Sequence, residues 1–250
     1  MTGTGRQTLA LYSGLSVATR LHVRVRWASC PFPLVAEVIP STGRVLEVGC
    51  GHGLFFCYLA LQSPQRQVHG VDLDDDKIQD ARVAATQAAR GGASVSFDVA
   101  ASGEVASGPW AGITIVDVLC LRDPDQQRHL ISECAARLAP AGVLVVKEVG
   151  FAPRWKFRWN VLQETLAVRV LGITKGREMA FLSPDQLGAA MRDAGLQFTV
   201  SRRVDRGRPH PHHLVVGRAP VVVLLVTGER PRVISCGRSG GAAKDRTPGN

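Results

Sequence analysis

The sequence predicts an α/β fold built on a doubly wound, mostly parallel sheet. Short apolar segments alternate with segments of helical periodicity, and this alternation is typical of parallel strands covered by helices on both faces. We expect strands at about 45–49, 67–71, 94–98, 113–117 and 143–148. The helices between them are expected at about 53–62, 75–90 and 124–138. A glycine-rich turn after the first strand and acids at the ends of several strands support the same fold class.

The first predicted strand runs into three glycines at alternate positions. Residues 45–53 read Val-Leu-Glu-Val-Gly-Cys-Gly-His-Gly, with the acid Glu47 just before Gly49, Gly51 and Gly53. Glycines suit a tight turn where the backbone comes close to a ligand, because a Cβ would block the approach. A dinucleotide fingerprint has its third glycine three residues after the second, and this sequence has it after two.

This acid-x-G-x-G-x-G pattern resembles motif I of the S-adenosylmethionine (SAM)-dependent methyltransferases with a Rossmann-like fold, the class I methyltransferases. SAM carries an ammonium, a carboxylate and a sulfonium, and has no phosphate. The resemblance implies that Glu47 pairs with the ammonium and that open backbone N–H groups of the turn bind the carboxylate. The alternative is a glycine-rich turn that binds no ligand.

Acids also end the second and third predicted strands. Asp72 lies nineteen residues after Gly53, close to the spacing of about twenty expected for an acid that binds ribose hydroxyls. Asp74–Asp76 suit the N-terminus of a helix and receive no site role. For Asp98 the resemblance implies a contact with the adenine amino group, and a plain loop acid is the open alternative.

The resemblance extends over about residues 40–218. Residues 112–119 form a strand that enters a loop at Asp117, where the family has its fourth motif. The helix over 124–138 is expected to stop at Ala139-Pro140-Ala141-Gly142 before the apolar fifth strand. After a helix over 184–194, the runs 196–203 and 213–217 suit a hairpin. In the family such an antiparallel pair completes a seven-stranded sheet.

Parallel sheets bind ligands at the carboxyl ends of their strands, where four of these acids are expected. The predicted cofactor site for S-adenosyl-L-methionine therefore gathers residues from several strand ends: Glu47, Gly49, Cys50, Gly51, Gly53, Asp72, Leu73, Asp98, Val99, Asp117 and Val118.

Charge is distributed unevenly along the chain. Residues 37–150 hold fourteen acids and nine bases, whereas residues 1–36 hold four arginines and no acid. Residues 151–218 hold twelve bases and five acids. We expect 1–36 to be a basic amphipathic segment packed on a methyltransferase domain over 37–218, with a lid at about 151–180. Residues 219–250 are expected to be a tail, disordered after about 237.

The basic flanks favour an anionic acceptor or an anionic surface. The lid segment interleaves bases with aromatics, and its expected acceptor-binding residues are Trp155, Lys156, Arg158 and Trp159. Residues 20–27 alternate bases with apolar residues in a similar way. Such segments suit a nucleic-acid strand or a membrane interface, and they equally suit ordinary helices packed on the sheet.

The expected reaction is an in-line displacement at the sulfonium methyl group. Candidate bases are Glu148 and His52, and Arg122 and Lys147 are candidate ligands for an acceptor carboxylate. We expect a small or lipid-like acceptor, anionic or hydroxyl-bearing. The alternatives are an RNA methyltransferase, although residues 117–120 lack the Asp/Asn-Pro-Pro-aromatic clamp, and a non-catalytic SAM-binding protein. An NAD dehydrogenase is disfavoured by the glycine spacing.

The lengths of the apolar runs, the N-terminal residues, the cysteines and the histidines bear on the compartment and on metal binding. No apolar run reaches the eighteen or so residues that span a bilayer, and the start lacks a signal-peptide layout, although its arginines also fit a transit peptide. The six cysteines form no C-x-x-C pair. His212 and His213 would face opposite sides of a strand. We therefore expect a cytoplasmic protein with no metal site and a possible peripheral membrane contact.

Overall fold

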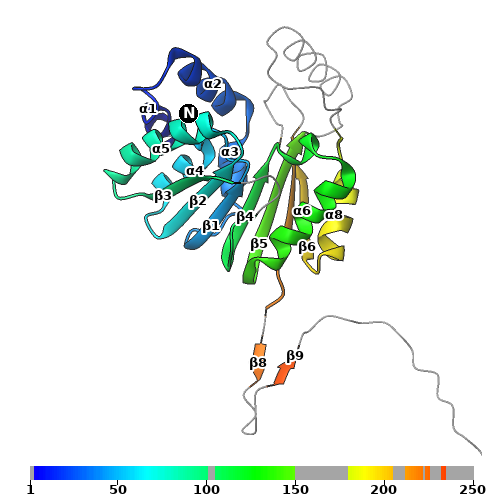
Figure 1. Cartoon of the computed structure of the whole chain (residues 1–250). Coiled ribbons are helices and arrows are strands. Elements are labelled where there is room, and N and C mark those ends of the chain that lie inside the picture. The colour runs from blue at the N-terminus through cyan, green and yellow to red at the C-terminus, as the bar shows by residue number, and fades with distance from the viewer. Residues whose placement is uncertain are drawn as a thin grey trace, which may run out of the picture.

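A seven-stranded mixed sheet forms the centre of the domain in the computed structural model (Figure 1). The structure describes residues 3–100, 105–149, 180–204, 212–221, 223–225 and 232–234. The strand order is β3-β2-β1-β4-β5-β7-β6. The strands are β1 (Gly43–Val48), β2 (Arg66–Asp72), β3 (Ser94–Val99), β4 (Trp110–Val116), β5 (Leu138–Val149), β6 (Gln197–Arg203) and β7 (His212–Arg218).

Strands β1 to β5 are parallel to one another, and β7 runs antiparallel to both β5 and β6. The predicted doubly wound fold with a closing antiparallel pair is therefore confirmed. Strand order reverses at β1, which has β2 on one side and β4 on the other. Crevices at such reversal points are the usual ligand sites of α/β sheets.

Helices cover both faces of the sheet (Figure 1). On one face lie α4 (Leu54–Gln62) and α5 (Asp75–Ala89), and on the other α6 (Pro124–Ala136) and α8 (Pro184–Asp193). The N-terminal helices α1 (Gly3–Ala10), α2 (Val17–Ser29) and α3 (Phe32–Ala36) join the α4 side, and α1 packs against α4.

The two core clusters follow from the alternation of side chains along each strand. In β1, Val45 belongs to the cluster on the α4 side and Leu46 to the cluster on the α6 side. In β5, Val145 and Val146 alternate in the same way. Continuing the alternation, Glu47 and Lys147 share the face of the N-terminal helices.

The passage into β5 differs from the prediction. The segment expected to be a turn after a helix is instead an irregular start of the strand, because Leu138 already pairs with Trp110. The register then shifts before Gly112 pairs with Val143, and Ala141 takes the left-handed conformation with φ 61°. The Pro-x-Gly sequence thus bends a strand here, and α6 ends at Ala136.

The C-terminal segment forms a second, small sheet. Within the predicted tail, β8 (Val223–Leu225) pairs antiparallel with β9 (Arg232–Ile234), and the described residues of this pair form a sheet separate from the main one. The predicted lid residues Trp155, Lys156, Arg158 and Trp159 lie outside the described residues, as does the tail after 237. Among the helices described, none has the length and apolarity to cross a bilayer.

Candidate functional site

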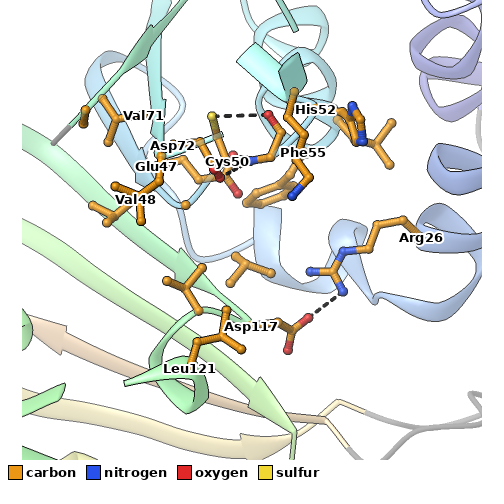
Figure 2. A pocket seen from close by; sticks show the side chains of 18 of the residues that line it. Arg26, Glu47, Val48, Cys50, His52, Phe55, Val71, Asp72, Asp117 and Leu121 are labelled. Atoms are coloured by element: carbon orange, nitrogen blue, oxygen red, sulfur yellow. Dashed lines mark hydrogen bonds and ion pairs between the residues drawn. The ribbon is translucent and has the colours of Figure 1, made fainter. Parts of the chain in front are cut away.

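A cavity of about 310 Å³ lies at the carboxyl ends of β1, β2 and β4 (Figure 2). Its floor is the turn after β1, its sides come from the ends of β2 and β4, and α2 supplies His22, Val23 and Arg26 as a roof. The cavity therefore sits at the point where strand order reverses, where the sequence predicted the cofactor site.

The glycine turn needs its glycines for packing and conformation. Gly49, Gly51 and Gly53 have φ values of 78°, 53° and 71°, in the left-handed region. A Cβ on Gly49 would overlap the Val118 side chain, and one on Gly53 would overlap the Phe97 ring. The turn is thus a closely packed cradle that other residues could form only under strain.

Most N–H groups of this turn are already bonded within the protein, which corrects the prediction that they are open to a carboxylate. Gly49 and Cys50 both donate to the Val71 carbonyl, at 2.8 and 3.0 Å. Gly51 donates to Asp72 Oδ2 at 2.7 Å. These bonds fix the turn against β2, so Gly49, Cys50 and Gly51 have no free N–H group for a ligand carboxylate.

Glu47 provides a buried acid with unused bonding capacity. The residue is 3% exposed and lines the cavity, and among the described residues no donor reaches its Oε2. Burial raises the pKa of Glu47 well above its ordinary value, Arg26 opposes that rise, and Asp72 adds to it. An unpartnered carboxyl oxygen at such a depth favours a cationic group in the cavity.

Asp72 is held in a fixed orientation at the end of β2. Its Oδ2 accepts from Gly51 N and its Oδ1 accepts from Asp74 N at 3.0 Å. A carboxylate has about four acceptor positions, so two remain for a ligand. Because Asp72 and Leu73 line the cavity beside the glycine turn, the acid is placed to accept hydrogen bonds from hydroxyl groups.

Asp117 lies across the cavity and links the roof to the sheet (Figure 2). It takes a left-handed φ of 58° and forms ion pairs with Arg26 at 2.7 Å and with Lys147 at 2.5 Å. Burial alone would raise the pKa of Asp117, but Lys147 and Arg26 hold it well below its ordinary value. Lys147 is 0% exposed, so the prediction that it binds an acceptor is corrected to a structural ion pair.

Glu148 points to the opposite face of β5 and does not line this cavity. Its Oε1 accepts from the backbone of Val118 at 3.1 Å and of Leu119 at 2.8 Å, which shapes the turn after β4. Burial and the charge of Asp117 raise its pKa. The geometry thus argues against Glu148 as the reacting base, and it leaves His52 as the sequence-derived candidate inside the cavity.

His22 of α2 and His52 of the glycine turn meet beneath the roof, and we call them the roof histidines. The His22 and His52 rings lie 4.9 Å apart, and His52 Nδ1 is 3.3 Å from Asp80 Oδ2. Burial is the largest cause lowering the pKa of each, and for His22 the neighbouring His52 and Arg26 lower it further. Both imidazoles are therefore neutral near pH 7 and able to accept a proton.

Bonds from the N-terminal helices hold this roof in place. The Tyr12 hydroxyl donates to the His52 carbonyl at 2.7 Å, and Thr19 donates to Asp80 at 2.8 Å. Sequence reasoning missed His22, Val23, Arg26 and Phe32 as cavity residues. For the three residues of α2 the only signal was the alternation of bases and apolar residues over 20–27. That alternation indicates an amphipathic helix but not what the helix covers.

The remaining predicted site residues divide into two groups. Val118 and Arg122 line the cavity, together with Ala100 from the segment after β3. Asp98 and Val99 do not line it. The Asp98 side chain is 60% exposed and pairs with Arg82 at 3.0 Å, so the geometry gives its predicted adenine contact no support.

Comparisons with known proteins agree with this site and fold. The model of the family described as a methyltransferase domain matches residues 22–200. A comparison with the curated proteins found no match. Among solved structures, magnesium protoporphyrin IX methyltransferase from Synechocystis PCC 6803 with bound SAH superimposes with a TM-score of 0.62 at 17% identity, covering 87% of this chain and 95% of that one.

Two further structures show how widely the fold is used. The [4+2]-cyclase SpnF matches with a TM-score of 0.59 at 18% identity over 76% of this chain and 80% of that chain. The putative methyltransferase in complex with the Trm112 methyltransferase activator from Haloferax volcanii matches with a TM-score of 0.61 at 17% identity, over 85% and 97%. By its family match and its fold, this chain belongs to the class I, SAM-dependent methyltransferase family.

Proposed function

We propose that the protein transfers the methyl group of SAM to a small or lipid-like acceptor that is anionic or bears a hydroxyl. The observation that carries the proposal is the convergence of Glu47, Asp72 and the glycine turn on one cavity at the strand-order reversal. Because the [4+2]-cyclase SpnF shares the fold, the fold alone does not establish methyl transfer. The argument therefore rests on the chemistry of the cavity.

The cavity offers one polar partner for each charged or polar end of the cofactor. Glu47, with its unpartnered buried oxygen, is proposed to bind the ammonium, and Asp72 the ribose hydroxyls. Arg26 is the proposed partner of the carboxylate, because it lines the cavity and the N–H groups of Gly49, Cys50 and Gly51 are occupied. When bound, SAM supplies an electrophilic methyl group on a sulfonium.

The residues above the turn would act on the acceptor. We assign His52, neutral and beside His22, as the group that accepts a proton from an acceptor hydroxyl, and Arg122 as a cation for an acceptor carboxylate. The roof of α2 limits access of water, and fixing two reactants in such a space lowers the barrier chiefly by positioning.

The size and lining of the cavity favour a small or apolar acceptor over a nucleic-acid strand. Phe32, Phe55 and Leu121 form apolar parts of its wall, and α2 closes it from above. A nucleic-acid methyltransferase would need an open path for a strand. The described residues also show no aromatic stacking platform at the cavity mouth, so RNA stays the second candidate.

Calorimetric titration with SAM and with NAD tests the cofactor assignment. We expect SAM and its demethylated product to bind and to raise the melting temperature by mass action, while NAD does neither. Radiolabelled SAM supplied with panels of small acids, lipids and oligonucleotides then identifies the acceptor. Binding of NAD without binding of SAM would reject the proposal, and binding of SAM with no transfer to any panel would indicate a non-catalytic SAM-binding protein.

A further inference from the structure

Helix α2 presents a row of exposed aliphatic side chains on the outside of the molecule. Val17 is 71% exposed, Leu21 62% and Val25 58%. Their four-residue spacing places them on one face of the helix. Exposed aliphatics are common singly, but three in a row on one helix form a surface that water solvates poorly. We call Val17, Leu21 and Val25 the aliphatic row.

Arginines flank this row on one side. A groove of about 330 Å³ between α1 and α2 is lined by Arg6, Arg20 and Arg24. Arg20 is partly fixed, since its Nη1 donates to the Ser13 carbonyl at 3.3 Å. Residues 1–36 contain no acid that could neutralise these guanidinium groups within the segment. Guanidinium groups bind phosphate oxygens well, often through two parallel hydrogen bonds.

The other side of the row borders the proposed active site. His22 and Arg26 follow Leu21 and Val25 by one residue, which is about 100° around the helix, and both line the main cavity. One helix therefore carries, side by side, a row of arginines, a row of exposed aliphatics and a row of cavity residues. Figure 1 shows α1 and α2 at the periphery of the molecule.

We propose that α1 and α2 form a docking surface for an anionic phospholipid membrane. The aliphatic row inserts among the acyl chains near the headgroups, and Arg6, Arg20 and Arg24 bind headgroup phosphates from the adjoining groove. An amphipathic helix with apolar residues beside arginines is the usual design of such an interface. The proposal deepens the proposed function and rests on it in one respect: docking would bring a lipid acceptor to the mouth of the cavity.

Other occupants of this surface fit the observations less well. A nucleic-acid strand would use the arginines but leave the aliphatic row unused, and stacking needs exposed aromatics. Trp27, the aromatic residue of α2, packs inward against Phe32 and Tyr58, with ring centroids 5.8 and 5.0 Å away. A second copy of the chain would oppose arginine to arginine across a two-fold axis, because the same surface meets itself.

Vesicle sedimentation with the full chain tests the proposal. Vesicles of phosphatidylcholine alone are compared with vesicles that also contain phosphatidylglycerol. We expect binding only to the anionic vesicles. Replacing the two groove arginines of α2, in Arg20→Gln/Arg24→Gln, should weaken binding about thirtyfold at about 1 kcal/mol for each basic residue. The triple variant Val17→Ser/Leu21→Ser/Val25→Ser should weaken binding roughly tenfold or more, because the inserted apolar area is lost.

Matched substitutions of exposed residues on α5 and α6 serve as controls. Val83→Ser removes another exposed aliphatic, 44% exposed on α5, and Arg128→Gln removes an exposed arginine on α6. Both should bind anionic vesicles as the unchanged protein does. Melting temperature is measured for all variants. The triple variant should melt at the same temperature as the unchanged protein, since the aliphatic row is proposed to face solvent.

Several outcomes overturn the proposal. Absence of vesicle binding by the unchanged protein, or equal binding by the arginine and control variants, rejects it. Oligonucleotide binding that the arginine variant loses, without vesicle binding, would assign the surface to nucleic acid. A lower melting temperature in the triple variant would show that the row packs against protein. Calorimetry with SAM on the same samples separates the two proposals: failed vesicle binding with intact SAM affinity rejects only the docking surface.

Discussion

The floor and the roof of the cavity are built in opposite ways. The floor comes from a continuous stretch, the end of β1 with its glycine turn, and its hydrogen bonds run to the neighbouring strand β2. The roof comes from α2, whose cavity residues reach distant parts of the chain, as in the ion pair of Arg26 with Asp117. Local spacing thus determines the floor, whereas tertiary contacts determine the roof.

Charge divides the two parts in the same way. The carboxyl ends of the strands contribute the acids Glu47, Asp72 and Asp117, the roof contributes Arg26 and His22, and His52 belongs to the glycine turn that faces the roof. A ligand with an ammonium, a carboxylate and hydroxyl groups, such as SAM, needs both parts. The following predictions, in order of expected effect, test whether floor and roof have these separate roles.

The largest effect is expected from the buried ion pair that joins them. Lys147→Met removes a fully buried partner of Asp117 and leaves that carboxylate with Arg26 alone. Removing one partner of a buried pair typically costs about 3–5 kcal/mol, because the other charge remains in a poor environment. Urea unfolding should show that the free energy of unfolding falls by an amount in that range. The double variant Asp117→Asn/Lys147→Met should recover part of it, and no recovery would mean that Lys147 acts by packing only.

The next largest effect is expected at Asp72, the acid at the end of β2 beside the floor. Asp72→Ala should weaken SAM binding by ~1.5–3 kcal/mol, the range for hydrogen bonds to charged groups. It also frees Gly51 N, so part of the loss comes from a looser turn. Asp75→Ala, which removes the exposed acid at the first residue of α5, is the control and should bind SAM normally. Calorimetry that gives both variants the same affinity would contradict the role of Asp72.

These two predictions mark the difference between what the sequence alone predicted and what required coordinates. The strands and the floor followed from periodicity and from glycine and acid spacing, and the closing antiparallel pair followed from the resemblance to the family. Lys147 and Glu148, adjacent in sequence at the end of β5, were both expected to act on the acceptor. Alternation along the strand sends them to opposite faces, and each then serves as an internal partner, one of Asp117 and one of the turn after β4.

Asp98 and α2 are two further cases in which the sequence alone did not predict where side chains lie. A strand-end acid can turn outward, and Asp98 does so to pair with Arg82. For α2, periodicity predicts an amphipathic helix, but the position of a helix over a sheet depends on contacts that no local pattern encodes. Here the bond of Tyr12 to the glycine turn and the bond of Thr19 to Asp80 on α5 hold the N-terminal helices in place.

A moderate effect is therefore expected from the anchor of the roof. Tyr12→Phe removes the hydroxyl that donates to the His52 carbonyl and leaves the buried ring in place. The free energy of unfolding should fall by ~0.5–1.5 kcal/mol, the usual worth of one hydrogen bond. Hydrogen exchange should rise in α1 and α2 and not in β1 or β4. An equal increase in exchange in all four elements would show that the roof does not open separately from the floor.

The smallest effect is expected from the histidines of the roof. Burial lowers the pKa of both His22 and His52, so the folded state favours their neutral forms. Unfolded histidines titrate near about 6.5. As pH falls below that value the unfolded state binds protons first, so stability should decrease from about pH 6.5 downward and level off below the lowered pKa values. Above pH 7 these two groups contribute no slope.

The double variant His22→Gln/His52→Gln tests this dependence through melting temperatures between pH 7.5 and 5. Its slope below pH 6.5 should be shallower than that of the unchanged protein, although His69, whose pKa burial also lowers, keeps part of it. If the double variant keeps the full slope, the roof histidines are not the groups that couple folding to protons, and the case for neutral His52 as the base loses its support.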